Sequence, residues 1–200
     1  MSGIDDIIHA WNDADPSAIH PTRGVSEDAY RESGEAQAEL LATVLPEGCK
    51  VIDFGCGDGR VAIPLRQLGY DVTGADGSPR MLARIAERDP GMPVIETDGT
   101  DLAQQLGKKK TDAVVSLAVL IHHDYEACEQ IVAGLRAAVK ANGLLILDWP
   151  VSDEPAEAGG WIGVTTWDRD RQDAVCKRLG LKRVDTDLPW PVFRAVKAGS

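Results

Sequence analysis

The sequence predicts an α/β protein with a doubly wound sheet of about seven strands and helices on both faces. Between residues 50 and 149, short apolar segments alternate with amphipathic segments, a pattern typical of parallel strands joined by right-handed helical crossovers. A second observation is the glycine-rich turn Gly55–Gly59, which directly follows the first of these apolar segments. Two apolar segments close the chain, and we expect the last strand to be antiparallel in a mostly parallel sheet.

Length and composition favour a single domain over residues 1–200. The chain is 44% hydrophobic with a net charge of −11, and the acidic balance argues against a nucleic-acid partner. The four cysteines form no Cys-x-x-Cys pair, which favours reduced thiols, no metal site and a cytoplasmic location. We expect no signal peptide and no membrane segment, because no apolar run approaches the roughly 20 residues that a membrane helix needs.

Residues 1–33 are predicted to form an N-terminal extension or a lid. Ile4–Trp11 has the pattern of a short helix, and the prolines and glycine of Asn12–Gly24 indicate a loop. Two hypotheses stay open for this segment, ordinary packing and a lid over a ligand. The candidate lid residues are Trp11, Arg23 and Tyr30.

The core of the fold is predicted over residues 34–149. Four of its helices begin after a residue whose side chain can accept a backbone N–H, namely Ser33, Ser78, Thr100 and Asp124. Asn142–Gly143 is expected to end the longest of these helices. The expected strands are 50–54, 71–75, 93–96, 111–117 and 144–149. The expected helices are 34–45, 60–68, 79–88, 101–106 and 125–140.

Residues 150–200 are predicted to form a loop, a helix and two closing strands. Residues 150–160 are rich in Pro, Glu and Gly, which indicates the loop. Trp161 and Trp167 follow it, and either they cover a ligand or they are buried in the core, which is the usual place for tryptophan. The expected helix is 169–179, and the expected strands are 181–188 and 192–197.

The turn Gly55-Cys56-Gly57-Asp58-Gly59 indicates a ligand site. Val51–Phe54 predicts a short buried strand that leads into it. The alternating glycines permit a tight bend and leave no Cβ between the backbone and a ligand. The next helix directs its free N–H groups and the positive end of its dipole at the turn. The sequence therefore predicts a small-molecule cradle between a strand and a helix.

Acidic residues occur near the carboxyl ends of three predicted strands, where ligands bind in open α/β sheets. Asp76 lies 19 residues after Gly57 and can accept two hydrogen bonds from a ribose diol. A NAD-binding protein would also have an acid there, but Arg60 stands where the NAD fingerprint has a small residue. Asp98 can accept from an adenine amine, and Asp148 either faces a substrate or bonds to the backbone.

Four segments together resemble the class I S-adenosylmethionine-dependent methyltransferases, a family with a Rossmann-like fold. The match is specific because all four occur at the family's spacing, within about residues 31–149. The segments are Val51–Arg60, Gly74–Leu82, Thr97–Leu102 and Asp112–His123. In the last of them, the two histidines stand one residue later than those of the family.

The resemblance implies that S-adenosylmethionine binds to this turn and leaves as S-adenosylhomocysteine. Each part of the ligand would contact a group of neighbouring residues. The methionine moiety would contact Asp53, by its amino group, and Gly55, Cys56 and Gly57. The ribose and adenine would contact Asp76, Gly77, Ser78, Asp98 and Gly99. The sulfonium would lie near the backbone of Ser116 and Leu117.

His122 and His123 are the candidate catalytic residues, because histidine titrates near neutrality and these two would lie at the mouth of the cleft. Packing or helix capping is the simpler alternative for both. In this interpretation residues 34–149 form the cofactor-binding core, and residues 150–200 form the substrate side of the domain.

We therefore expect a methyltransferase that acts on a small molecule, since the sequence shows neither a basic face for nucleic acid nor a separate substrate domain. Two alternatives remain. One is a nicotinamide-dependent oxidoreductase, which NAD would stabilise. The other is a non-catalytic protein that binds S-adenosylmethionine without transferring its methyl group. The sequence identifies neither the acceptor, the attacking atom nor the oligomeric state.

Overall fold

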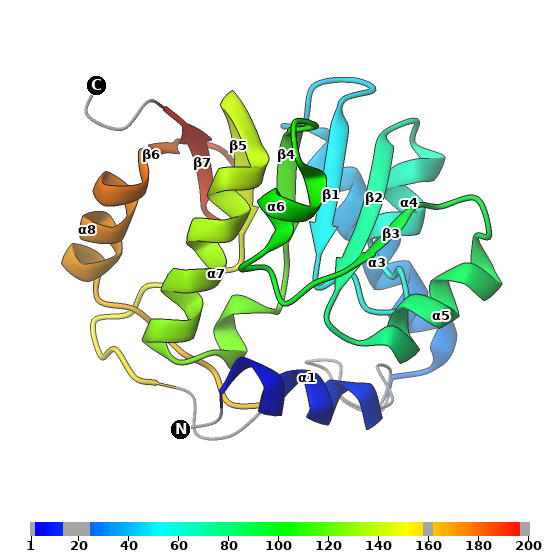
Figure 1. Ribbon diagram of the computed structural model, residues 1–200, viewed down its shortest axis with the longest axis horizontal. Coiled ribbons are helices and arrows are strands. Elements are labelled where there is room, and N and C mark those ends of the chain that lie inside the picture. The colour runs from blue at the N-terminus through cyan, green and yellow to red at the C-terminus, as the bar shows by residue number, and fades with distance from the viewer. Residues whose placement is uncertain (1–2, 14–24, 158–161, 197–200) are drawn as a thin grey trace.

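A computed structural model describes residues 3–13, 25–157 and 162–196 and confirms the α/β architecture. A seven-stranded sheet has the order β3-β2-β1-β4-β5-β7-β6, and β7 is antiparallel to both of its neighbours. Helices cover both faces (Figure 1). The strands are β1 Lys50–Phe54, β2 Asp71–Asp76, β3 Val94–Glu96, β4 Thr111–Ser116, β5 Val139–Leu147, β6 Leu181–Val184 and β7 Val192–Ala195.

The helices follow the predicted order with some changes in their ends. The described α-helices are α1 Ile4–Asp13, α3 Glu27–Ala42, α4 Ala62–Gln67, α5 Pro79–Arg88, α6 Leu102–Leu106, α7 Tyr125–Ala138 and α8 Arg169–Leu179. A short 3₁₀ helix, η1, spans Leu120–His122. None of the helices in the described ranges is both long enough and apolar enough to cross a membrane.

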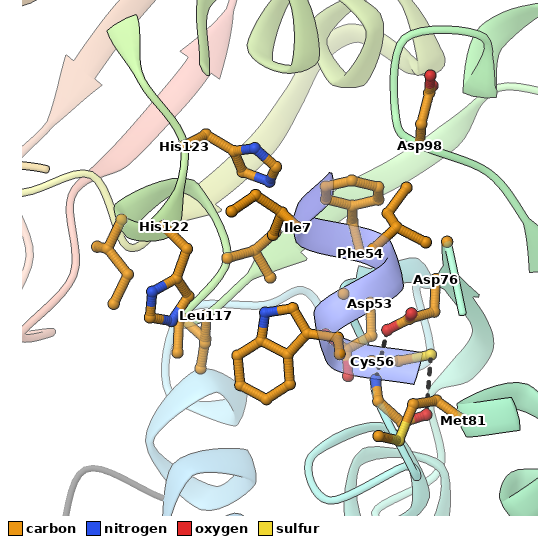
Figure 2. Close-up of a pocket in the computed structure, with 18 of the residues that line it drawn as sticks. Ile7, Asp53, Phe54, Cys56, Asp76, Met81, Asp98, Leu117, His122 and His123 are labelled. Carbon is orange, nitrogen blue, oxygen red and sulfur yellow. Dashed lines mark hydrogen bonds between the residues drawn. The ribbon is translucent and has the colours of Figure 1, made fainter. Parts of the chain in front are cut away.

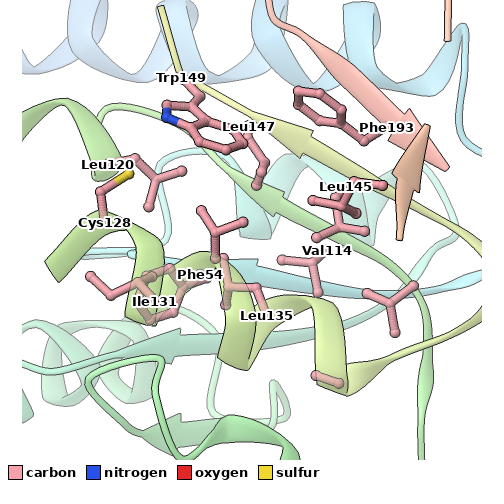
Figure 3. Close-up of a cluster of buried hydrophobic side chains, with 14 of the residues drawn as sticks. Phe54, Val114, Leu120, Cys128, Ile131, Leu135, Leu145, Leu147, Trp149 and Phe193 are labelled. Atoms are coloured by element: carbon pink, nitrogen blue, oxygen red, sulfur yellow. The ribbon is translucent and has the colours of Figure 1, made fainter. Parts of the chain in front are cut away.

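The core lies on both faces of the sheet because successive residues of each buried strand point to opposite sides. On one face, Phe54 and Leu145 pack with Ile131 and Leu135 of α7 (Figure 3). On the other face, Val51, Val115 and Ile146 pack with apolar side chains of α3, α4 and α5. Both layers are thus fixed around β1 and β4, the two strands whose carboxyl ends form the site.

The order of connection reverses between β1 and β4. These strands pair in parallel, with Val51 opposite Ala113, although β2 and β3 lie between them in the chain. Loops after the two strands therefore leave in opposite directions and open a crevice at their carboxyl ends. Helix α1 lies along this edge of the sheet (Figure 1).

The predicted N-cap at Ser33 is wrong. Helix α3 begins earlier, and the side chain of Ser26 caps it by accepting the Ala29 N–H at 3.2 Å. Ser33 lies inside the helix, where its hydroxyl donates to the carbonyl oxygen of Tyr30 at 2.6 Å. Glu27 and Asp28 stabilise the new first turn through the helix dipole.

Thr100 also does not cap a helix. The N-cap of α6 is Asp101, which makes no side-chain capping bond. The Thr100 hydroxyl and N–H both donate to Asp98 Oδ1, at 2.7 and 2.8 Å, in a turn that precedes the helix. The predicted caps Ser78 and Asp124 are confirmed, since they accept the N–H groups of Met81 and Ala127.

Asn142–Gly143 does not end the helix that precedes it. Helix α7 ends at Ala138, and β5 already begins at Val139, which pairs with Thr111. Asn142 has a φ of 65°, and the pairing then resumes between Ala113 and Leu144. The turn signal therefore marks an irregularity within a strand.

The remaining differences concern element ends and tryptophans. Helix α4 begins at Ala62, two residues after the predicted start, and β6 ends at Val184. Trp167 is fully buried and packs edge-on against Trp149 at 5.1 Å between ring centroids, so it belongs to the core. The predictions for Arg23 and Trp161 fall outside the described residues.

Candidate functional site

A cavity of about 540 Å³ lies at the carboxyl edge of the sheet, over β1, β2 and β4 and against α1. Ten of the thirteen predicted cofactor-binding and catalytic residues line it (Figure 2). They are Asp53, Gly55, Cys56, Gly57, Asp76, Gly77, Asp98, Leu117, His122 and His123. Three others, Ser78, Gly99 and Ser116, are buried beside the cavity and do not line it.

The glycine turn has the backbone that only glycine adopts easily. Gly55, Gly57 and Gly59 have φ values of 72°, 54° and 85°, all in the left-handed region. A Cβ on Gly55 would lie 2.0 Å from Val119 Cγ2, whereas a Cβ on Gly57 would meet nothing within 4 Å. The space above Gly57 belongs to the cavity, so this glycine leaves room for a ligand.

Asp76 connects the end of β2 to the glycine turn. Its Oδ2 accepts the Gly57 N–H and its Oδ1 accepts the Ser78 N–H, both at 2.8 Å. Burial raises the pKa of Asp76, and the surrounding backbone N–H groups oppose that rise. Each oxygen keeps a lone pair for a further donor, which fits the ribose role that the sequence predicts.

Asp53 is a buried carboxyl group at the floor of the cavity, with 4% of its surface exposed. Burial raises its pKa to about 7, and Asp76 adds to the rise while Arg60 opposes it. A cation placed beside Asp53 would favour its charged form. The thiol of its neighbour Cys56 has a raised pKa because of burial, so this cysteine fills space.

Asp98 lies at the rim of the site, apart from Asp53 and Asp76. Its carboxylate is turned away from the other labelled side chains (Figure 2) and bonds to Thr100. Gly99 also lies off the cavity, since its N–H donates to Thr97 Oγ1 at 3.0 Å and its α-carbon packs on Phe54. Asp98 therefore lines the cavity only at its rim, and Gly99 lies behind it.

Sequence reasoning missed Asp58, which anchors the glycine turn. Its buried carboxylate accepts from Tyr30 Oη at 3.1 Å and from Arg31 Nη2 at 2.6 Å. Its backbone carbonyl accepts from Arg88 Nη1 at 2.6 Å. Helices α3 and α5 thus hold the turn in place. The sequence signal that could have indicated this role is an acidic residue inside the glycine turn, followed two residues later by Arg60.

Helix α1 forms one wall of the cavity with Ile4, Ile7, Ile8 and Trp11. Ile8 packs on Gly77, where an added Cβ would lie 2.5 Å from Ile8 Cδ1. Of the predicted lid residues, Trp11 and Tyr30 do line the cavity. The apolar spacing of this helix was its only sequence signal, and spacing does not say which surface a helix covers.

His122 is held in one orientation. Its Nδ1 lies 2.9 Å from the carbonyl oxygen of Gly163, and its ring lies 5.6 Å from that of Trp11. A carbonyl can only accept, so the neutral ring carries its proton on Nδ1 and a lone pair on Nε2. Burial lowers the pKa of His122, which keeps this form populated at neutral pH.

His123 is the more buried of the pair, with 4% of its surface exposed. Burial lowers its pKa to about 4, so the ring is neutral at pH 7. Its Nδ1 has no hydrogen-bond partner among the described residues, although its backbone carbonyl accepts from Thr165 Oγ1 at 2.6 Å. A buried polar atom of this kind is costly unless a ligand or water satisfies it.

The segment after β4 turns sharply at Ala118, whose φ is 57°. Asp148 supports this strained backbone, because its Oδ2 accepts the Ala118 N–H at 3.2 Å. Asp148 does not line the cavity. Of the two predicted roles, a substrate contact or a bond to the backbone, the structure shows the bond to the backbone. The backbone carbonyl of Ser116 accepts a hydrogen bond from the Asp148 N–H at 2.8 Å. Of the two residues predicted near the sulfonium, Ser116 and Leu117, only Leu117 lines the cavity.

Comparison with known proteins gives consistent matches. A family described as "Methyltransferase domain" matches residues 51–143. The chain is 33% identical to a glycine/sarcosine N-methyltransferase of Parasynechococcus marenigrum over 66% of this chain and 50% of that protein. It is 28% identical to a ubiquinone biosynthesis O-methyltransferase of Cereibacter sphaeroides over 57% of this chain and 46% of that protein. The chain thus spans about half the length of these curated relatives.

A solved structure shares the fold along nearly the whole chain. It is the magnesium protoporphyrin IX methyltransferase of Synechocystis with bound S-adenosylmethionine, which covers 98% of both chains with a TM-score of 0.68. The sequence identity is 20%, so the likeness concerns the arrangement of helices and strands.

Proposed function

Because this chain belongs to the class I S-adenosylmethionine-dependent methyltransferase family, we propose that it methylates a small molecule and releases S-adenosylhomocysteine. The observation that carries this proposal is the joint position of the open Gly57 cradle and the Asp53 and Asp76 carboxyl groups in one cavity. Residues 34–149 would hold the cofactor, and residues 150–200 would complete the acceptor side.

The residues present fit an adenosyl sulfonium. The open space at Gly57 admits the methionine moiety, and Asp53 provides a carboxyl group for its ammonium. Asp76 lies at the end of β2 with lone pairs for the two ribose hydroxyls. When bound, S-adenosylmethionine supplies an electrophilic methyl group on a positively charged sulfur.

The main contribution of this chain to the reaction would be to position the acceptor and the cofactor, because methyl transfer needs the nucleophile in line with the methyl group. We assign the acceptor to the side of the cavity formed by α1 and the His122–His123 segment. His122 presents a neutral Nε2 that can take a proton from the acceptor. His123, with its unsatisfied Nδ1, can bond to the same molecule.

Thermal unfolding in the presence of three ligands tests the proposal. S-adenosylmethionine and S-adenosylhomocysteine should raise the melting temperature, and NAD should not. Stabilisation by NAD alone would favour the oxidoreductase alternative. The non-catalytic alternative predicts stabilisation by both adenosyl compounds without formation of S-adenosylhomocysteine across a broad acceptor screen.

A further inference from the structure

The acceptor side of the cavity is walled by apolar side chains. Helix α1 contributes Ile7, which is buried, and the segments after β4 and before α8 contribute Leu117, Ile121 and Val164. Val164 lines the cavity and is 52% exposed, so part of its apolar surface is open to a ligand. Such a surface favours a ligand with a large apolar area.

Three of the four charged side chains of the described cavity wall, Arg60, Asp53 and Asp76, surround the glycine turn, and the fourth, Asp98, lies at the rim with its carboxylate turned away from the other labelled side chains (Figure 2). Arg60 is the one residue of the described cavity wall that carries a permanent positive charge. Its Nη1 donates a hydrogen bond to Ser33 Oγ at 3.1 Å. Asp53 and Asp76 lie on the same side as Arg60, around the glycine turn. Figure 2 shows the His122 and His123 rings on the side away from Asp76. A charged acceptor would therefore lose its hydration without finding a partner of opposite charge.

The polar groups that remain on the acceptor side are neutral imidazoles. His122 offers a lone pair on Nε2, because the Gly163 carbonyl fixes the proton on Nδ1. The Nδ1 atom of His123 is buried and has no partner within the described ranges. The Trp11 ring, 5.6 Å from that of His122, adds an aromatic surface to this side.

We infer that the acceptor is an uncharged aromatic compound with a hydroxyl group, methylated on oxygen, and that His122 and His123 recognise that hydroxyl. This assignment rests on the proposed function and narrows it to one substrate class. Carboxylate and ammonium acceptors are disfavoured by the apolar wall, whereas Trp11 and the aliphatic side chains offer apolar surface to an aromatic ring.

The step balances without a further reactant. Nε2 of His122 takes the hydroxyl proton as the acceptor oxygen forms a bond to the methyl carbon. The carbon–sulfur bond breaks, and its electron pair stays on sulfur as the sulfonium becomes a neutral thioether. The proton on His122 then leaves to solvent. Asp148 and His123 are the titratable groups that act on His122, and α1 presents Trp11 to it.

Binding of size-matched probes tests the substrate class. Protein saturated with S-adenosylhomocysteine is titrated with 2-naphthol, 2-naphthoate and (2-naphthylmethyl)ammonium by calorimetry. We expect 2-naphthol to bind at least about tenfold more tightly than either charged probe. Only the charged probes would lose the hydration of a charge without gaining a partner of opposite charge in the cavity. Equal or tighter binding of a charged probe, or no binding of 2-naphthol, overturns the inference. Failure of S-adenosylhomocysteine itself to bind would instead contradict the proposed function.

The pH dependence of methyl transfer to 2-naphthol tests the role of His122. Wild-type protein should form the O-methyl product, and its absence overturns the inference. In His122→Ala, first shown to bind S-adenosylhomocysteine like wild type, the rate should rise about tenfold per pH unit toward the phenol pKa near 10. Without the histidine only the ionised naphthol reacts. A variant with the same pH profile as wild type would contradict this role.

Discussion

Asn12 accepts a hydrogen bond from Ser78, with 2.8 Å between Asn12 Oδ1 and Ser78 Oγ. Arg80 Nη1 adds a bond to the Asn12 carbonyl at 2.9 Å. These contacts join the end of α1 to the start of α5, immediately after Asp76. The wall that α1 provides is therefore fixed to the part of the site assigned to the ribose.

The Asn12→Ala variant should weaken the docking of α1 and raise the KM for the acceptor. Losing a neutral hydrogen bond costs about 1 kcal/mol, which corresponds to about a fivefold change. Steady-state kinetics with a fixed cofactor concentration measures it. Asp13→Ala is the matched control on the same helix, since Asp13 is exposed. A KM that changes equally in both variants would argue against the Asn12 contact.

Asp76→Ala should weaken binding of S-adenosylhomocysteine by about 1–3 kcal/mol, because a partly buried charged acceptor is lost. Isothermal titration calorimetry measures the change. Asp71→Ala is the control, because Asp71 lies at the other end of β2 and pairs with Lys50 on the surface. Unchanged affinity in Asp76→Ala would remove the ribose role from this residue.

Alanine at Gly57 and at Gly55 should have different effects. Each variant has a left-handed backbone that costs about 1–2 kcal/mol, but Gly55→Ala also clashes with Val119. We expect Gly55→Ala to lose more stability in urea unfolding, whereas Gly57→Ala should lose cofactor affinity because its methyl group occupies the cradle. Wild-type affinity in Gly57→Ala would show that the ligand lies elsewhere.

Binding of S-adenosylmethionine should tighten as pH rises from about 5.5 to about 7.5. Asp53 has a pKa of about 7 in the free protein, and a bound ammonium group favours its charged form. Binding therefore releases a proton below pH 7 and gains strength as Asp53 ionises. Calorimetry at several pH values measures this, and Asp53→Asn should bind more weakly with a flatter pH dependence. A wild-type affinity that falls over this range would contradict the pairing.

The sequence was sufficient to predict the sheet and the glycine turn that lies beside Asp76. Gly55, Gly57 and Gly59 adopt the left-handed backbone that their spacing suggests, and Asp76 reaches the turn from the neighbouring strand. These features depend on local patterns, since each is a turn or a strand end. The same locality explains why the caps Ser78 and Asp124 were predicted correctly.

The docking of α1 and the start of α3 could not be predicted because they depend on contacts distant in sequence. Asn12 and Ser78 are 66 residues apart, and no local pattern of α1 indicates that they meet. The start of α3 was missed because Tyr30 is held by Asp58, 28 residues away, so the helix extends beyond its apolar run. Ala118 gives no sequence signal of its positive φ, which Asp148 supports from another strand end.

Titration of the protein with S-adenosylhomocysteine in a calorimeter tests the central claim most directly. We predict saturable heat for one molecule per chain, with no displacement by NAD, because the proposed site joins the open Gly57 turn to the Asp53 and Asp76 carboxyl groups in one cavity. The absence of binding heat with this compound and with S-adenosylmethionine, or displacement of either by NAD, would contradict the account.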